Sequence, residues 1–427
     1  MLAAAARRSR KRPRRSRRET PPLPLDLVLE IAARSDPATL VRCAATCKDL
    51  RRQVADPSFH GNLRLRHADR FVPSLLLGHL VWKSPTDLHI VENATLRATK
   101  LLSAEGWGRQ PGQINGKPPS LSWSHKVLTA RDGLLLISTR DKLHTELMLR
   151  VCNPASGRCQ IVPRQRYEGQ YVLLVSDNIN NGDDGAIVGR RFRVLKVTSK
   201  SAMNSKDRRI LQFQTFFSEH DRWAGRSVNV PIPFVHGGWF RQQPLVTNDG
   251  ALHWLCRSDK LYYIVKLHVE SAQVTSTELS ARFHREYGSF AAAKKQILLA
   301  TTSAGSGTLC VFVAEKEKIT VWAQSKRDSS RWTKQPQMEV EYDATMCCET
   351  EGRMPRERPW TVKLEWFSDR SGAMLMEAPG HGFYMLDVQS KKVFGWPPLL
   401  GYCCGADVNC PYAMDISSWV PTFTKFF

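Results

Sequence analysis

The stretch PPLPLDLVLEIAAR, residues 21–34, holds three prolines followed by a short run that is apolar on more than one side. Pro24 suits the first turn of a helix, where the missing N–H of proline costs nothing. Asp26 adds negative charge near the helix N-terminus, where the helix dipole favours it. The sequence therefore predicts a helix that starts here and carries more apolar side chains than one packed face requires.

The apolar residues of this run divide between two faces of the predicted helix. At about 100° per residue, one face holds Leu25, Val28, Leu29 and Ala32. Leu27 and Ile31 fall on the opposite side. A unit of about 45 residues has little capacity to bury two apolar faces on its own. The second face therefore needs either a partner protein or contact with the rest of the chain, and both alternatives remain open from the residues alone.

Two more short helices are predicted directly after this run. Asp36 suits the N-cap of the first of them, with Pro37 at its first helical position. Its apolar residues follow at spacings of three and four: Leu40, Cys43, Ala44 and Cys47. A third helix or turn is predicted around residues 48–54, and the sequence ADPSF at residues 55–59 ends the pattern.

From about Trp123 onward the pattern changes to short strands separated by turns. DGLLLIS at residues 132–138 predicts a strand behind a turn, and residues 147–163 predict strand, Asn-Pro…Gly turn and strand. Similar segments recur at residues 308–324 and 360–396. Roughly 280 residues of antiparallel strands favour a closed or radially repeated β architecture, and at about 40–50 residues per blade that length fits about six blades.

The helical stretch at residues 23–59 resembles an F-box. The residues that match the family pattern in order and spacing are Leu23, Pro24, Asp26, Leu27, Glu30, Ile31, Leu40, Cys43, Cys47, Lys48, Arg51, Asp56, Pro57 and Phe59. Ser35 and Leu50 depart from it, because the family usually has Leu and Trp there. The resemblance covers about a tenth of the chain.

The F-box resemblance implies docking on the SKP-type adaptor of a cullin–RING ubiquitin ligase. By that resemblance the adaptor-binding residues are Leu23, Pro24, Leu25, Leu27, Ile31, Leu40, Cys43, Cys47 and Leu50. Such a chain makes no covalent bond itself, because it raises effective concentration by holding a target protein near a conjugating enzyme. The target protein is not identified by the sequence.

The β region is similar to the associated domain of plant F-box proteins, through the phrases GLLL at residues 133–136, CNP at 152–154 and GR at 157–158. That resemblance implies a propeller-like domain that receives a protein to be ubiquitylated. The predicted fold class is α+β multidomain, with a small all-α F-box helical unit followed by a large all-β domain that is propeller-like. The predicted domains are a basic tail at 1–20, the F-box at 21–70, a connector at 71–120, with a first strand near residues 88–91, and the β domain at 121–427.

The net charge of +22 is partly concentrated in the predicted tail. The tail contains a block of nine basic residues, which repel one another and cannot be buried, so we expect disorder there. These nuclear-import candidates are Arg7, Arg8, Arg10, Lys11, Arg12, Arg14, Arg15, Arg17 and Arg18. A polyanion-binding arm and a merely solubilising tail are the other interpretations. The expected location is nuclear, cytoplasmic or both.

Other function classes receive little support from the sequence. MLAAAA is followed at once by arginines, so no secretory signal is expected, and no apolar run has the length of a membrane helix. Eleven scattered cysteines without a Cys-x2-Cys spacing predict reduced thiols and no zinc site. No cofactor, metal or catalytic residues are predicted, because no phosphate loop and no nucleophile elbow is found.

Two hypotheses follow. The first is a non-catalytic substrate receptor, in which rim residues such as Trp223 or Trp239 line a target-binding surface. The alternative is a basic nucleic-acid or chromatin-binding protein whose F-box-like segment is structural only. The concentration of charge in a tail and the lack of an aromatic-basic motif favour the first.

Overall fold

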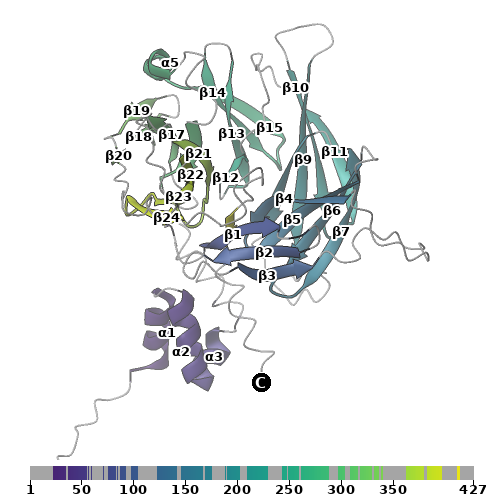
Figure 1. The fold of residues 1–427 in the computed structure, drawn as a ribbon, viewed down its shortest axis with the longest axis vertical. Coiled ribbons are helices and arrows are strands. Elements are labelled where there is room, and N and C mark those ends of the chain that lie inside the picture. The colour runs from purple at the N-terminus through teal and green to yellow at the C-terminus, as the bar shows by residue number, and fades with distance from the viewer. Residues whose placement is uncertain are drawn as a thin grey trace, which may run out of the picture.

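Three short helices precede a long series of strands in the computed structural model (Figure 1). The structure describes residues 23–34, 37–54, 56, 59, 71, 76–82, 84, 87–92, 98–103, 123–141, 146–166, 169–175, 188, 190–201, 209–228, 243–247, 249–258, 261–287, 297–302, 308–315, 318–328, 331–335, 338–339, 362–378, 382–396 and 411–413. The nine basic residues of the predicted tail, Trp239 and the predicted N-cap Asp36 lie outside these residues.

The helices are α1 (Leu25–Arg34), α2 (Pro37–Thr46) and α3 (Lys48–Val54), and each contacts the other two. Pro24 directly precedes α1, and its carbonyl oxygen accepts hydrogen bonds from the backbone N–H groups of Leu27 and Val28. Pro37 opens α2, as its fixed φ favours. The three helices are called the helical unit below.

The strands form six antiparallel sheets, which are the blades of a β-propeller. Blades 1 and 2 contain β25 (Pro411–Ala413), β1 (Leu76–Trp82), β2 (Asp87–Glu92) and β3 (Ala98–Ser103), then β4 (Trp123–Arg131), β5 (Leu134–Asp141), β6 (Glu146–Asn153) and β7 (Arg158–Arg166). Blades 3 and 4 contain β8 (Gln170–Val175), β9 (Phe192–Ser201), β10 (Arg209–Phe217) and β11 (Arg222–Val228), then β12 (Leu245–Val246), β13 (Ala251–Arg257), β14 (Tyr262–His268) and β15 (Gln273–Glu278). Blades 5 and 6 contain β16 (Ile297–Thr301), β17 (Leu309–Glu315), β18 (Lys318–Gln324), β19 (Trp332–Lys334) and β20 (Met338–Glu339), then β21 (Lys363–Phe367), β22 (Ala373–Ala378), β23 (Gly382–Asp387) and β24 (Lys392–Trp396).

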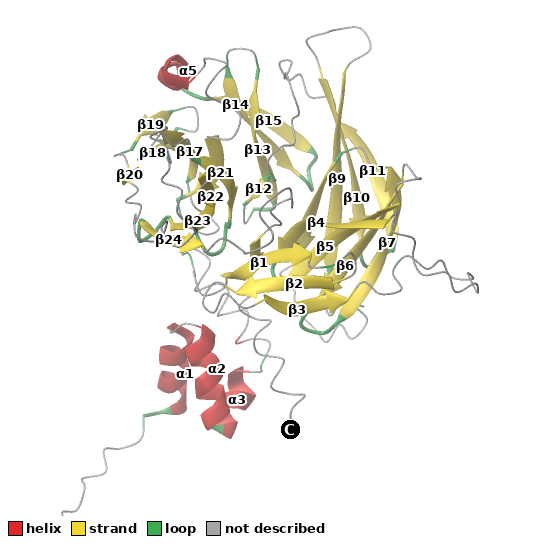
Figure 2. Cartoon of the chain, in the orientation of Figure 1, coloured by secondary structure: helices red, strands yellow, loops and turns green. Residues whose placement is uncertain are grey.

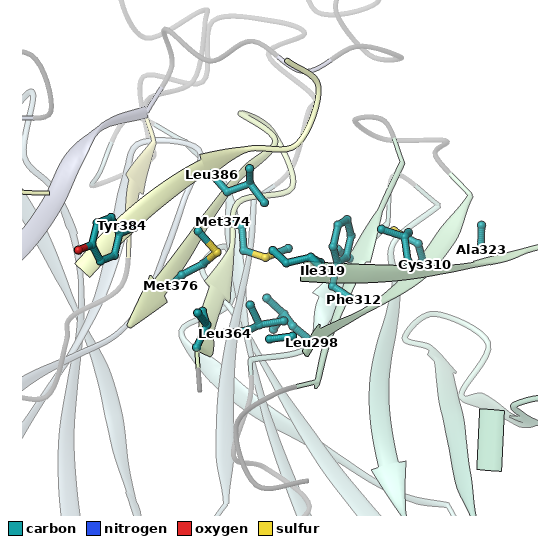
Figure 3. Packing of buried hydrophobic residues seen from close by; sticks show 14 residues of the cluster. Leu298, Cys310, Phe312, Ile319, Ala323, Leu364, Met374, Met376, Tyr384 and Leu386 are labelled. Carbon is teal, nitrogen blue, oxygen red and sulfur yellow. The ribbon is translucent and has the colours of Figure 1, made fainter. Parts of the chain in front are cut away.

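An apolar cluster lies between each pair of neighbouring blades, including the last pair, blades 6 and 1. Figure 3 shows the cluster between blades 5 and 6, where Phe312 and Ile319 face Met374 and Met376. Because each blade packs on two neighbours, the alternating side chains of its strands are buried on both faces. The prediction of a propeller-like β domain behind a helical unit is confirmed.

The ring is closed by its C-terminal strand. Strand β25 pairs with β1, so that blade 1 combines residues from both ends of the propeller. The segment expected to be a connector, residues 71–120, therefore contributes β1–β3 to a full blade. The local sequence could not predict this blade, because the pairing of β1 with β25 joins residues more than 300 positions apart.

The predicted strand–turn–strand units are present, with the geometry that their turn residues require. Asp132 and Gly133 both have positive φ, 48° and 80°, as a two-residue hairpin turn demands. After β6, the Asn153 side chain accepts a hydrogen bond from the Ala155 N–H at 3.1 Å, and Gly157 takes a φ of 69°. The Asn-Pro…Gly phrase thus encodes the β6–β7 turn.

Two features of the β domain differ from expectation. Cys152 and Cys159 form a disulfide, although reduced thiols were expected, because the β6–β7 register places them directly opposite one another. A short helix, α5 (Ala281–Tyr287), lies between blades 4 and 5 and buries Phe283 and Tyr287. Figure 2 shows it as the one described helix outside the helical unit.

Two buried histidines make the stability of the propeller depend on pH. Burial lowers the pKa of His79 and of His253 to about 4, well below the ordinary 6.5. The unfolded chain therefore binds more protons, so the free energy of unfolding is highest above pH 6.5 and falls as the pH drops from 6.5 toward 4. Each histidine is expected to cost about 2 kcal/mol at pH 5.

Urea unfolding at pH 7.5 and pH 5 measures this dependence. The free energy of unfolding is expected to differ between the two pH values by about 2 kcal/mol less in His253→Gln than in the unchanged chain. This holds whatever the effect of the substitution on stability at pH 7.5. If the free energy of unfolding differs between pH 7.5 and pH 5 by the same amount in this variant as in the unchanged chain, His253 is not buried in its neutral form.

Candidate functional site

The helical unit carries an apolar stripe on its outer surface, formed by Leu23, Leu27 and Ile31. Their exposed fractions are 62%, 51% and 58%. Leu27 and Ile31 are one turn apart on the same side of α1, and Leu23 lies two residues before the helix begins. Large apolar side chains this exposed, grouped on a short helix and the residues just before it, are typical of a protein interaction site.

The other side of α1 holds the helical unit together. Ala32 and Ala33 are buried against Leu40, Ala44 and Val54, and Leu29 packs at the edge of this cluster. Two adjacent alanines allow α1 to approach its neighbours closely. This small core is complete without Leu27 or Ile31, which leaves the apolar stripe at the surface.

The nine residues expected to bind the adaptor occupy three kinds of position. Leu23, Pro24, Leu27 and Ile31 are exposed. Leu25, Cys43 and Cys47 are half-buried. Leu40 and Leu50 are buried, at 2% and 6% exposure, where a partner does not reach them unless the helices move apart. We therefore keep only the exposed members as candidates for direct docking.

The polar residues around the stripe stabilise the helices. Arg34 and Glu30 form an ion pair at 3.0 Å, one turn apart on α1. The Arg51 guanidinium donates hydrogen bonds to the carbonyl oxygens of Ala44 at 3.3 Å and Ala45 at 3.5 Å. These carbonyls lie in the last turn of α2, where a cation is favoured by the helix dipole. Sequence reasoning assigned no role to Arg51, although its position just after a helix end was a signal for capping.

On the propeller, Trp223, which was predicted to line a target-binding surface, is packed between blades 2 and 3. Its indole Nε1 donates a hydrogen bond to the Pro163 carbonyl oxygen at 3.1 Å, and its ring lies 5.7 Å from the Phe216 ring. Trp223 is half-buried and joins blade 3 to blade 2, so only part of it faces solvent.

One cluster combines the residue types of a hydrolase triad without its connectivity. The Thr247 hydroxyl contacts both Asp249 and His253. Asp249 is bonded to Lys266 at 3.1 Å and to the Ala251 N–H at 3.2 Å, and it does not orient the histidine ring. A triad needs the acid on the far side of the imidazole, so this cluster fixes the turn before β13.

Two further searches cover only the part of the chain that the structure describes. There, no group of three His, Cys, Asp or Glu side chains is arranged to hold a metal ion. No described helix has both the length and the apolar character needed to cross a membrane. Among the described residues, the apolar stripe of the helical unit is the candidate site.

Comparison with known proteins gives two family matches. A family model described as F-box-like matches residues 21–66, and one described as a domain of unknown function, DUF7595, matches residues 120–395. No curated protein matches the chain.

Several solved structures resemble this chain at low identity and low TM-score. The β-propeller domain of Nup133 from Vanderwaltozyma polyspora is 10% identical, with a TM-score of 0.33 over 74% of this chain and 94% of that one. YCF48, solved bound to a D1 peptide, is 7% identical, with a TM-score of 0.35 over 74% and 80%. A prolyl endopeptidase is 11% identical, with a TM-score of 0.34 over 88% of this chain and 54% of that one. Likeness at this level says nothing about function.

Proposed function

We propose that this chain, which belongs to the DUF7595 family and carries an F-box-like domain before its propeller, is the substrate-recognition subunit of an SKP–cullin–F-box ubiquitin ligase. An F-box-like domain followed by a β-propeller fits a substrate-recognition adaptor. The observation that carries the proposal is the exposed apolar stripe of Leu23, Leu27 and Ile31 on the F-box-like domain.

In this proposal the two parts of the chain have separate tasks. The helical unit docks on an SKP-type adaptor, and through it on cullin and RING subunits. The propeller binds a target protein and keeps it within reach of a conjugating enzyme. The chain supplies no catalytic group, because proximity alone raises the rate of ubiquitin transfer.

Covering the apolar stripe contributes to such an association. Covering one large aliphatic side chain contributes about 1.5–3 kcal/mol, so three of them provide several kcal/mol before the costs of association are subtracted. Because these side chains are already partly covered, their docking provides less than full burial from water would.

The proposed location is the nucleus, the cytoplasm or both. The block of nine basic residues at 7–18 supports nuclear import by its composition. The same charge supports the alternative of a nucleic-acid or chromatin-binding protein, which predicts binding that weakens steeply with salt.

Co-purification with an SKP-type adaptor tests the proposal. The full-length chain and the adaptor, produced together, are expected to elute as one complex that survives high salt, because the contact is apolar. A complex that forms only with DNA or RNA, and not with the adaptor, would contradict the proposal and favour the alternative.

A further inference from the structure

One outer strand of the propeller lacks the basic residues that the other outer strands carry. The last strand of each blade is the outer one, because the first strands of neighbouring blades contact one another, as β4 contacts β8 and β16 contacts β21. Strands β3, β7, β11, β19 and β24 each contain Lys or Arg. Strand β15, with the sequence QVTSTE, contains neither, and it holds no Pro or Gly. Its outer side is called the β15 edge below.

The β15 edge lacks the protection that exposed sheet edges normally have. Charged residues and prolines on outer strands prevent unwanted pairing, because the open N–H and C=O groups of an edge attract another strand. Strand β7, for example, has Pro163 near its middle and three arginines. In β15 the β-branched residues Val274, Thr275 and Thr277 favour the extended conformation instead. An edge of this kind is suited to strand addition by another polypeptide.

The register of β14 and β15, which run side by side (Figure 1), fixes which backbone groups face outward. The Leu279 N–H donates to the Tyr262 carbonyl oxygen at 3.0 Å, so these two residues are a hydrogen-bonded pair. Such pairs alternate along an antiparallel ladder, and the β15 residues bonded to β14 are therefore Gln273, Thr275 and Thr277. The residues whose N–H and C=O groups face outward are Val274, Ser276 and Glu278. Among the residues that the structure describes, β15 pairs with no strand other than β14.

The strand is held in place at both ends. Glu270, in the turn before β15, pairs with Arg193 of blade 3 at 3.4 Å. The Glu278 carboxylate lies 3.3 Å from Nε2 of His284 on α5. Val274 packs against the apolar cluster between blades 3 and 4. A strand fixed in this way loses little conformational freedom when a second strand pairs with it, which favours binding.

The size of the β15 edge decides between a second copy of this chain and a short segment of another protein. Six residues span about 20 Å and a sheet is about 10 Å thick, so pairing covers roughly 200 Å² on each partner. A stable interface between two folded chains covers about 800 Å² on each. The β15 edge alone is too small for a dimer, whereas an extended segment binds such an edge through its backbone.

We infer that the β15 edge binds an extended segment of the target polypeptide, which adds to the four strands of blade 4 as a further strand. The inference rests on the proposed function, because it names the form in which the propeller would hold its target. The backbone of the segment bonds to the outward groups of Val274, Ser276 and Glu278. Its side chains on the blade 5 side lie beside Thr275 and Thr277, where Thr and Val make favourable pairs across strands. A nucleic acid offers no such row of N–H and C=O groups.

Two substitutions of Ser276 test the role of the outward backbone groups. Ser276→Pro removes the central outward N–H and no bond to β14, at the kind of edge position where proline is tolerated. Ser276→Ala keeps the N–H and is the matched control. The probe is a fluorescein-labelled Lys-Thr-Val-Thr-Val-Thr-Lys peptide, and its binding to the full-length chain is measured by fluorescence anisotropy. Ser276→Pro is expected to weaken binding by at least about tenfold and Ser276→Ala by less than about twofold.

Three outcomes of these measurements would overturn the inference. The first is equal binding by the two variants, and the second is no binding of the peptide by the unchanged chain. The third is a dimer of the unchanged chain, seen by light scattering, that Ser276→Pro dissociates, because the β15 edge would then belong to a second copy.

Hydrogen exchange of the unchanged chain tests the same point without a substitution. Peptide binding is expected to slow exchange of the outward N–H groups of Val274, Ser276 and Glu278. The N–H groups of Thr275 and Thr277 already bond to β14 and are expected to change little. Equal protection of all five groups, or protection of none, would contradict strand addition.

The adaptor separates failure of this inference from failure of the proposed function. Ser276→Pro is expected to co-purify with the SKP-type adaptor as the unchanged chain does. If the adaptor complex forms and Ser276→Pro binds the peptide as Ser276→Ala does, the inference alone is wrong. If no adaptor complex forms but the peptide binds and Ser276→Pro weakens that binding, the β15 edge stands as a docking site and the proposed function falls.

Discussion

Replacing both Leu27 and Ile31 by Asp is expected to lower the affinity of the full-length chain for an SKP-type adaptor by at least about a hundredfold. Each change removes an aliphatic contact worth at most about 1.5–3 kcal/mol and places a carboxylate in a surface that the adaptor would cover. The fold is expected to tolerate both changes, because the side chains are 51% and 58% exposed and lie outside the core of the helical unit. Titration calorimetry with purified adaptor measures the loss.

The matched control places two Asp residues elsewhere on the same helical unit. Ala45 and Arg52 are exposed and lie outside the apolar stripe, on α2 and α3. Ala45→Asp with Arg52→Asp is expected to change adaptor affinity by less than about threefold, within the usual range for exposed charges. An equal loss in the control would mean that the docking face is not the one on α1, and unchanged binding by the Leu27 and Ile31 variant would reject the stripe.

The exposure of Leu27 and Ile31 was predictable because a helix imposes a simple geometry. Both residues fall opposite Leu29 and Ala32 at 100° per residue, and the structure has Leu29 and Ala32 in the core. Leu25 and Val28 were expected on that inner face and are only half-buried, since α2 and α3 cover just part of α1. Short helices give a reliable direction for each side chain but not the extent of the neighbour that covers it.

Leu40 and Leu50 are the two predicted docking residues that are buried in the structure. The resemblance grouped both with the docking residues. In the structure, Leu40 belongs to the core cluster with Ala44 and Val54, and Leu50 is 6% exposed on α3. Which side of α2 and α3 faces inward depends on the angles between three helices, and a residue pattern does not contain those angles.

The β domain could be predicted as a class but not as a connected ring. Local turn phrases identified hairpins such as β6–β7, because Asn153 and Gly157 act within a few residues of each other. The disulfide between Cys152 and Cys159 and the pairing of β25 with β1 depend on register and on distant segments. Strand β25 has three described residues, too few to carry a strand pattern of its own.

Tyr412→Ala is expected to destabilise the propeller by about 3–5 kcal/mol, the usual cost of deleting a buried aromatic side chain. Tyr412 is 2% exposed and packs in the cluster between blades 1 and 2. Its position in β25 is opposite Gly78 of β1, and its hydroxyl donates a hydrogen bond to the Gly133 carbonyl oxygen at 3.2 Å. The Gly133 N–H in turn donates to the Ala413 carbonyl oxygen at 3.1 Å. One side chain thus joins the closing strand to two blades.

Tyr412→Phe separates the packing of this ring from its hydrogen bond. The ring stays in place and only the bond to Gly133 is lost, so the expected cost is about 1 kcal/mol. Urea unfolding of both variants measures the contributions of packing and of the hydrogen bond to the free energy of unfolding. Protease cleavage gives an independent readout of whether strand β25 separates from the propeller. If the Ala variant loses no more unfolding free energy than the Phe variant, neighbouring side chains fill the cavity left by the phenol ring. Closure of the propeller then does not depend on Tyr412. Burial between blades 1 and 2 raises the pKa of the Tyr412 hydroxyl above its ordinary range, so the hydroxyl stays a neutral donor. A much larger loss of stability in the Ala variant than in the Phe variant would therefore show that apolar packing between these blades, and not the hydrogen bond, provides most of the strength of the closure.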